Sequence, residues 1–459
     1  MNTEIISKLE GIVGKEWVMT KLDEIENYLR DETEKTVRPK PAERVVVVKP
    51  GSAQEISEIL KLANELKVPV FPRGAGTGLV GGAIPTKDGI VISLERLNKI
   101  LEIDTENMMA VVEAGVPFSK IDEEAAKHGL SFPPHPGDET ATIGGNIACN
   151  AGGARCVKYG VVRDYVKGLE VVLPTGEIVT YGGKLLKNAT GYDLMQLFIG
   201  SQGTLGIITK AILRLRPRPK ADATLIVSFK NRHDAVKSVP LILQQGVTPL
   251  GIEYVEREAV EKAVKEIGFG RKWPEGEAFL IIIVAENSQE EVYAVAEKID
   301  EICRKCGAHE TLIEEGKRQQ KAILDVRSKI GETTEYTLDV LDVSVPPANM
   351  AKLLDELEKL AKKYGIVLPA YGHVGDGNLH PHILDERAGG IRREDLEKIS
   401  YEIYDIVVSL GGVISGEHGI GRIRKKYLPK YLSKKQLEDM RKIKELFDPN
   451  NILNPGNIL

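Results

Sequence analysis

The chain reads PRGAGTGLVGG over residues 72–82. Its glycines at positions 76, 78 and 81 have the spacing G-x-G-x-x-G, which is typical of a dinucleotide-binding loop between a strand and a helix. That loop needs a helix directly after it, because the amides at the helix N-terminus hold the pyrophosphate. Here Pro85 and a β-like run over residues 89–94 follow instead. The glycines still let successive backbone N–H groups turn toward a phosphate, so the stretch predicts an anion-binding loop, with a purely structural turn as the alternative.

Two further loops have the same composition. One reads PGDETATIGGN over residues 136–146 and continues through NAGG at 150–153; the other reads GSQGTLGIIT over residues 200–209. Three loops of Gly, Ser, Thr and Asn in one domain predict a long ligand that backbone amides hold along its length. A dinucleotide fits this expectation better than a mononucleotide.

Length and charge restrict the class of protein. The 459 residues exceed what one hydrophobic core usually serves, which favours two domains. The 62 basic and 67 acidic residues are interspersed, so the chain has no electrostatic footprint for nucleic acid and a small-molecule substrate is expected. The longest apolar run, residues 278–285, is far shorter than the roughly 20 residues that span a bilayer. With no secretory pattern and only four cysteines, we expect a cytoplasmic location and reduced thiols.

The order of predicted elements changes along the chain. A capping box, SAQE at residues 52–55, predicts a helix over residues 53–66 between strands at 44–48 and 68–71. Residues 74–206 read as short strands with one clear helix, at 118–128. The proline-rich RLRPRP at residues 214–219 marks a domain boundary. Beyond it, strands and helices alternate in α+β order, which predicts an antiparallel sheet backed by helices. The predicted strands are 225–229, 251–256, 279–285 and 341–345, and the predicted helices are 234–244, 258–267, 289–306, 348–364 and 434–447.

Four of the eight histidines cluster near the C-terminus. His373, His380, His382 and His418 fall within fifty residues, and the turn-forming GDG at 375–377 lets the chain bend so that two imidazoles meet. Two imidazoles and the carboxylate of Glu417 would satisfy a divalent metal and leave positions open for a substrate. The alternative is that these histidines only form hydrogen bonds within a loop.

The three glycine loops together resemble those of the vanillyl-alcohol oxidase and p-cresol methylhydroxylase superfamily of flavoproteins. The branch resembled most is that of the FAD-linked D-2-hydroxy acid dehydrogenases, of the D-lactate dehydrogenase and glycolate oxidase large flavin subunit type. The resemblance covers roughly residues 41–459. It implies an α+β fold, with a two-part FAD-binding domain of the p-cresol methylhydroxylase type and an α+β cap domain with an antiparallel sheet. The implied segments are an N-terminal helical segment (1–40), the FAD-binding domain (41–219), the cap or substrate domain (220–415) and a C-terminal segment that returns to the flavin domain (416–459).

The resemblance also implies which residues surround FAD. Several superfamily members attach the flavin covalently through a histidine, and Thr77 occupies that place here, so dissociable FAD is expected. The residues implied in cofactor binding are Pro72, Arg73, Gly74, Ala75, Gly76, Thr77, Gly78, Pro136, Gly137, Thr142, Gly144, Gly145, Asn146, Asn150, Gly152, Gly206, Ile207, Ile208 and Asn454.

For the histidine cluster, the resemblance implies a divalent metal, commonly zinc, on His373, His380 and Glu417. Manganese and iron suit the same ligands. His418 matches the family's general base, and Arg327 matches an arginine that grips the substrate carboxylate. His382 is left as a further ligand or a substrate contact, and Asp376 as a residue that orients a ligand or only forms the turn.

The implied reaction is oxidation of a small D-2-hydroxy acid to the 2-oxo acid, by metal-assisted deprotonation of the hydroxyl and hydride transfer to flavin N5. Members that act on 2-hydroxyglutarate look to have a lysine where Val340 stands, which favours D-lactate or glycolate here. A 2-hydroxyglutarate-type dehydrogenase, an alkyl-dihydroxyacetonephosphate synthase-like enzyme and a non-catalytic electron-transfer subunit are the alternatives. Expected partners are an iron–sulfur subunit, an electron-transferring flavoprotein, a cytochrome or a quinone as electron acceptor, with a peripheral membrane location through such a partner and a homodimer as further expectations.

Overall fold

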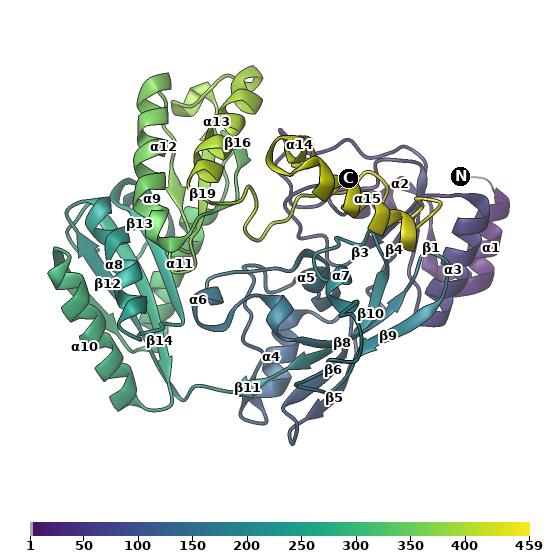
Figure 1. Ribbon diagram of the computed structural model, residues 1–459, viewed down its shortest axis with the longest axis horizontal. Helices are drawn as coiled ribbons and strands as arrows, with labels where there is room; N and C mark the ends of the chain where they lie inside the picture. Colours follow the sequence, from purple (N-terminus) through teal and green to yellow (C-terminus); the bar gives the residue numbers. More distant parts are fainter. Residues whose placement is uncertain (1–2) are drawn as a thin grey trace. The chain divides into compact units, whose positions relative to one another are not determined.

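The computed structural model describes residues 3–459, and these divide into two compact units (Figure 1). Unit 1 comprises Met1–Gly152, Val161–Arg218 and Glu417–Leu459, and unit 2 comprises Gly153–Gly160 and Pro219–Gly416. The chain therefore leaves unit 1 and returns to it at the end. No helix within the described residues is long and apolar enough to cross a membrane.

A small sheet carries the first glycine loop of unit 1. Its strand order is β1-β2-β4-β3, and β4 pairs in parallel with both β2 and β3. The four valines of β2 are all buried, as expected of a parallel strand covered on both faces. The bounds are β1 Val18–Met19, β2 Val45–Val48, β3 Val70–Arg73 and β4 Gly89–Ser93. The glycine loop follows β3 and leads to β4 with no helix between them, as the sequence predicted.

The predicted capping box is confirmed with one change of partner. Helix α3 (Ala53–Leu66) begins after Ser52, whose side chain accepts a hydrogen bond from the Glu55 amide at 3.1 Å. The Glu55 carboxylate reaches one residue further back and accepts from the Gly51 amide at 2.7 Å. Both side chains thus satisfy amides that the helix leaves open.

A second, antiparallel sheet in unit 1 has the order β5-β6-β10-β8-β9. Its strands are β5 Ile100–Asp104, β6 Met109–Glu113, β8 Val166–Val172, β9 Ile178–Gly182 and β10 Ile207–Arg214. The prediction of a single helix over residues 74–206 was wrong, because short helices accompany α4 (Phe118–Ala126). They are α5 Ile143–Cys149, α6 Cys156–Tyr159 and α7 Met195–Phe198.

Helix α5 shows why the pattern misled. Its two glycines weaken helix propensity, yet a Cβ on Gly144 would lie 2.7 Å from the Ala114 Cβ. The glycine is required by this close approach of helix to strand, which only the tertiary structure reveals.

Unit 2 contains the predicted antiparallel sheet, in the order β13-β14-β12-β15. The strands are β12 Ala221–Phe229, β13 Gly251–Glu256, β14 Ala278–Glu286 and β15 Ala308–Glu314, and the helices of the unit include α8 Arg232–Gln244, α9 Arg257–Ile267, α10 Gln289–Lys305, α11 Lys317–Gly331, α12 Met350–Tyr364 and α13 Leu396–Ser409. A buried cluster that includes Ile226, Val255, Phe279 and Val326 joins this sheet to α9 and α11.

A smaller sheet in unit 2 is centred on β19, which pairs with β16, β17 and β18. Of the predicted strand at 341–345, only β17 (Val343–Ser344) forms; β16 (Thr337–Val340) ends before it, and Asp342 lies between the two strands. The other two strands are β18 Ala370–Tyr371 and β19 Asn378–Leu384. The C-terminal helix α15 (Lys434–Phe447) matches its predicted bounds.

An N-terminal stretch of unit 1 braces the first glycine loop. The buried Thr33 hydroxyl accepts a hydrogen bond from the Gly81 amide at 2.6 Å, and the Glu32 amide donates to the Gly78 carbonyl at 3.0 Å. The guanidinium of Arg73 donates to the carbonyls of Arg30 and Asn27 at 2.7 and 2.8 Å. The loop is therefore held at both of its ends.

We predict that Thr33→Val lowers the free energy of unfolding by about 1–3 kcal/mol, because it leaves the buried Gly81 amide without an acceptor. Urea unfolding followed by circular dichroism measures the change. Thr105→Val, at an exposed position after β5, is the matched control and should change stability by less than about 0.5 kcal/mol. Equal losses of unfolding free energy in the two variants would contradict a stabilising role for the hydrogen bond between Thr33 and Gly81.

Candidate functional site

The loop after β3 presents a row of backbone amides. Within the described residues, the amides of positions 74–78 donate no hydrogen bond to protein. A Cβ on Gly74 would lie 2.2 Å from the Thr142 hydroxyl, so the loop lies against the start of α5. Gly76 has a φ of +83°, which favours glycine. Consecutive open amides on a glycine loop fit a pyrophosphate, which needs several donors and tolerates no side chain in between.

The second glycine loop forms the entry to α5. Thr142 is its N-cap, and Gly144, Gly145 and Asn146 lie in its first turn. The Thr142 Oγ1 and Asn146 Nδ2 atoms are buried and have no hydrogen-bond partner in the described part of the chain. Orphaned buried polar atoms call for a ligand or water. This loop also fits the polar portion of a dinucleotide, while Pro136 and Gly137 lie in the irregular stretch before it.

The remaining predicted cofactor residues have structural contacts of their own. Asn150 ends α5 in the left-handed conformation, and its Oδ1 accepts from the Arg163 amide at 3.0 Å. Gly206 packs so closely against Val171 that a Cβ would lie 2.4 Å from it, and Ile207 and Ile208 follow as buried residues of β10. Gly152 is buried beyond α5.

Asn454 connects the C-terminal segment with two loops of unit 1. Its Nδ2 donates to the carbonyls of Gly82 at 3.0 Å and Gln202 at 2.9 Å, and its Oδ1 accepts from Arg422 at 2.5 Å. Burial lowers the pKa of the Arg422 guanidinium to about 10. The segment that ends the chain thereby fixes the ends of the first and third glycine loops.

Four side chains form a group that could hold a metal ion. One ligand atom each from Asp342, His380, Glu417 and His418 lies within 4.8 Å of the others. His380 lies on β19, and Asp342 lies in the break between β16 and β17. Oxygen and imidazole-nitrogen donors of this kind suit zinc, manganese or iron.

Backbone continuity places Glu417 and His418 in this group. Ser415 Oγ donates to the Asp342 carboxylate at 2.8 Å, and the Gly416 amide donates to the Asp342 carbonyl at 3.1 Å. Glu417 and His418 are the next two residues of the chain. Asp342 thus serves both as a candidate ligand and as the anchor of the segment that supplies two more.

Three of the predicted residues, His380, Glu417 and His418, lie in this group, and Asp342 was not predicted. Nothing in the local sequence distinguishes Asp342 from other carboxylates, except that it interrupts an apolar run. His373 is outside the group, although its ring centroid lies 5.5 Å from that of His380. The turn at 375–377 therefore brings the two imidazoles close, as expected.

A buried carboxylate holds His373 and Arg327. Glu253 on β13 is 2% exposed; its Oε1 lies 2.6 Å from His373 Nδ1, and its Oε2 accepts from Arg327 Nε at 2.6 Å. Burial would raise the pKa of Glu253, but its contacts with His373 and Arg327 lower it to about 2. The Arg327 guanidinium also lies over the Tyr371 ring, 4.9 Å from its centroid. Sequence reasoning missed Glu253, since nothing marks it within an apolar strand.

His382 and Asp376 have local partners. His382 Nε2 is in contact with the Tyr371 hydroxyl, and the His382 side chain is buried. Asp376 accepts a hydrogen bond from the Asn378 amide at 3.2 Å, as a turn residue does.

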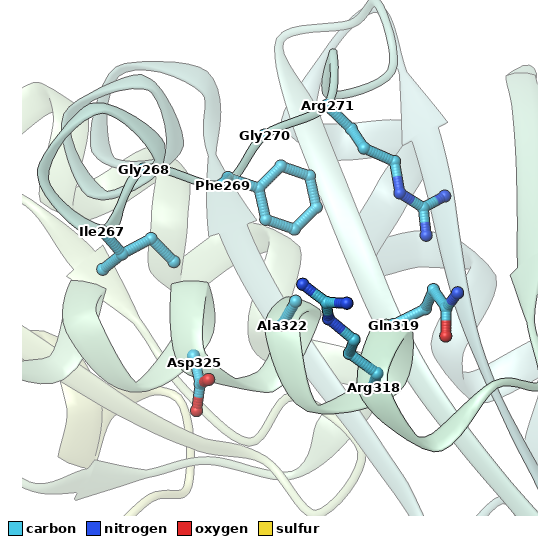
Figure 2. A pocket seen from close by; sticks show the side chains of 9 residues that line it. All are labelled: Ile267, Gly268, Phe269, Gly270, Arg271, Arg318, Gln319, Ala322 and Asp325. Carbon is cyan, nitrogen blue, oxygen red and sulfur yellow. The ribbon is translucent and has the colours of Figure 1, made fainter.

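A separate pocket of about 400 Å³ lies on unit 2, between the end of α9 and the start of α11. Figure 2 shows Phe269 and Arg271 on one side of it and Arg318 on the other. Arg271 is paired with Glu314 at 2.5 Å. None of the predicted site residues lines this pocket.

Two sequence families match the chain. Residues 45–182 match the FAD binding domain, and residues 218–458 match the C-terminal domain of FAD linked oxidases. A D-lactate dehydrogenase of Archaeoglobus fulgidus is 45% identical over 94% of this chain and 95% of its own length. A D-lactate dehydrogenase of Anaerostipes hadrus is 38% identical over 99% and 97%. The glycolate oxidase subunit GlcD of Bacillus subtilis is 38% identical over 90% and 88%.

Solved structures confirm the predicted fold class. p-Cresol methylhydroxylase superposes with a TM-score of 0.77 at 20% identity, covering 99% of this chain and 96% of that chain. An alkyldihydroxyacetonephosphate synthase gives 0.72 at 21% identity, covering 99% and 86%. At these identities the likeness concerns the fold alone, and the family follows from the sequence matches. The chain belongs to the FAD-linked oxidases, with an FAD-binding domain followed by the C-terminal domain of that family.

Proposed function

We propose that this protein oxidises a small D-2-hydroxy acid, D-lactate or glycolate, to the 2-oxo acid with dissociable FAD and a divalent metal, with zinc expected. The observation that carries the proposal is the group of Asp342, His380, Glu417 and His418, the first two of them buried, in a chain of the FAD-linked oxidases. Relatives named D-lactate dehydrogenase and glycolate oxidase subunit GlcD, which match over nearly the whole chain, support the substrate class.

Arg327 suits the substrate carboxylate. Its Nε is engaged by Glu253, while its two terminal amino groups donate no hydrogen bond within residues 3–459. Those groups form a planar fork that matches the two oxygens of a carboxylate. The Tyr371 ring beneath the guanidinium restrains its plane.

His418 is the proposed base for the substrate hydroxyl, because a ring nitrogen of neutral imidazole can accept a proton. The proposed ligands are His373, His380 and Glu417. His380 and Glu417 lie in the four-residue group together with Asp342, which is a further candidate ligand. A bound divalent metal supplies positive charge beside the hydroxyl and makes its deprotonation easier. Bound FAD supplies the two-electron acceptor, at N5.

Val340 supports a monocarboxylate. It ends β16 opposite His382 on β19, at the position where dicarboxylate-using relatives look to have a lysine. An apolar side chain there offers no charge to a second carboxylate. We further propose that Thr77 leaves the flavin without a covalent bond, and that electrons pass to an iron–sulfur subunit, an electron-transferring flavoprotein, a cytochrome or a quinone.

Anaerobic addition of D-lactate or glycolate is predicted to bleach the flavin absorbance near its visible maximum, because the substrate's electrons reduce the bound FAD. Stopped-flow absorbance measures the rate. D-2-Hydroxyglutarate, tested in parallel, should reduce the flavin more slowly, since Val340 provides no countercharge. An oxidised flavin spectrum with every 2-hydroxy acid in the panel would refute the proposed reaction.

Two histidine variants separate metal binding from proton transfer. His380→Ala is predicted to lose bound zinc, measured by inductively coupled plasma mass spectrometry, together with flavin reduction. His418→Ala should retain zinc and reduce the flavin about 10²- to 10⁴-fold more slowly, the usual contribution of a general base. His128→Ala, exposed after α4, is the control for loss of an imidazole. Loss of zinc in His418→Ala would reassign His418 as a ligand.

A further inference from the structure

We propose that Glu253 is a positioning residue that orients Arg327 and His373 together, so that carboxylate recognition and metal binding depend on one buried carboxylate. The inference rests on the proposed function for the roles of these two residues. Glu253 itself touches neither substrate nor cofactor in this assignment. It acts through the side chains that its two oxygens hold, each at 2.6 Å.

The register of the backbone brings the three residues together. The chain at 372–375 runs beside β13, with the Tyr254 amide donating to the Gly372 carbonyl at 2.9 Å and the Gly375 amide to the Ile252 carbonyl at 3.2 Å. Glu253 and His373 are therefore neighbours across a local pairing. Arg327 approaches from α11, which the buried side chain of Val326 fixes in the core cluster of the sheet.

Glu253 leaves the reactive side of Arg327 available. Its hydrogen bond to Arg327 is made to Nε, and the two terminal amino groups can donate to another carboxylate. Tyr371 holds the guanidinium plane from one face, and its own hydroxyl donates to the Gly331 carbonyl at 3.0 Å. An arginine held at Nε and on one face has few rotamers left, which lowers the entropic cost of binding a carboxylate.

Glu253 also selects the tautomer of His373. Because a carboxylate only accepts hydrogen bonds, the 2.6 Å contact requires the proton of His373 to be on Nδ1. The lone pair of the neutral ring is then on Nε2, which is the form that binds a metal ion. Carboxylates that hold a ligating histidine in this way raise its basicity and fix the direction of its ring.

Glu253→Gln tests the coupling, because an amide has one acceptor oxygen and cannot serve both partners. Isothermal titration of the metal-depleted, FAD-loaded protein with Zn²⁺ should show a dissociation constant raised about 10- to 100-fold. KM for D-lactate should rise about 10-fold or more, as expected for loss of one charge-assisted hydrogen bond. Glu286→Gln, which removes a carboxylate paired with Lys158 at 2.8 Å elsewhere in unit 2, should leave both values unchanged.

A second variant separates the effect on carboxylate recognition from the effect on metal binding. Arg327→Lys should raise KM and leave the Zn²⁺ dissociation constant unchanged, because lysine offers no planar fork while Glu253 still holds His373. If Glu253→Gln does not fold, Glu253→Asp retains the charge on a side chain too short to span both partners, and it should raise the same two values by less.

Unchanged zinc affinity and KM in Glu253→Gln, or a parent protein that binds no divalent metal, would overturn the proposal. Failure of the proposed function gives a different result. If no 2-hydroxy acid reduces the flavin, the proposed effect of Glu253 on substrate recognition through Arg327 is refuted. A lower Zn²⁺ affinity of Glu253→Gln than of Glu286→Gln would still support its proposed effect on His373.

Discussion

A carboxylate that is buried away from water must find charged or hydrogen-bonding partners, and this requirement organises the residues around two buried carboxylates of unit 2. Asp342 is 3% exposed and accepts hydrogen bonds from Asn378 at 2.9 Å and Ser415 at 2.8 Å. Those partners come from β19 and from the end of unit 2, so one buried carboxylate joins the strand that carries His380 to the segment that leads into Glu417. Glu253 meets the same requirement with His373 and Arg327.

In unit 1 the governing constraint is the close approach of backbones. The loop after β3 lies against the first turn of α5, where a Cβ on Gly74 would meet the Thr142 hydroxyl, and α5 lies against the strand end at Ala114. At these close approaches there is no space for a Cβ, so only glycine fits. The absence of side chains also leaves the backbone amides uncovered. The first glycine loop offers amide donors for an anion without a helix directly after it, because it presents its own row of amides and α5 begins beside it.

The two units divide the chemistry that the family requires. The FAD-binding domain matches residues 45–182, and the stretch Asn27–Thr33 that braces its first loop precedes this match. Unit 2 contains Arg327, His373, His380 and the buried carboxylates of Glu253 and Asp342, whereas Glu417 and His418 begin the last segment of unit 1. The resemblance to FAD-linked D-2-hydroxy acid dehydrogenases, drawn first from three glycine loops, is confirmed by relatives up to 45% identical.

The sequence by itself determined whatever depends on neighbouring residues. The glycine loops, the capping of α3 by Ser52, the strands and helices between residues 225 and 306 and the turn between His373 and His380 follow from local composition and spacing. The sequence patterns did not predict β15, β16, β18, β19, α11 or α13. Tertiary structure decided what depends on contacts between distant segments. Asp342 and Glu253 are single carboxylates in apolar runs, and α5 carries glycines that argue against a helix. Strand register and close packing give these residues their partners, and neither is encoded within a short window of the chain.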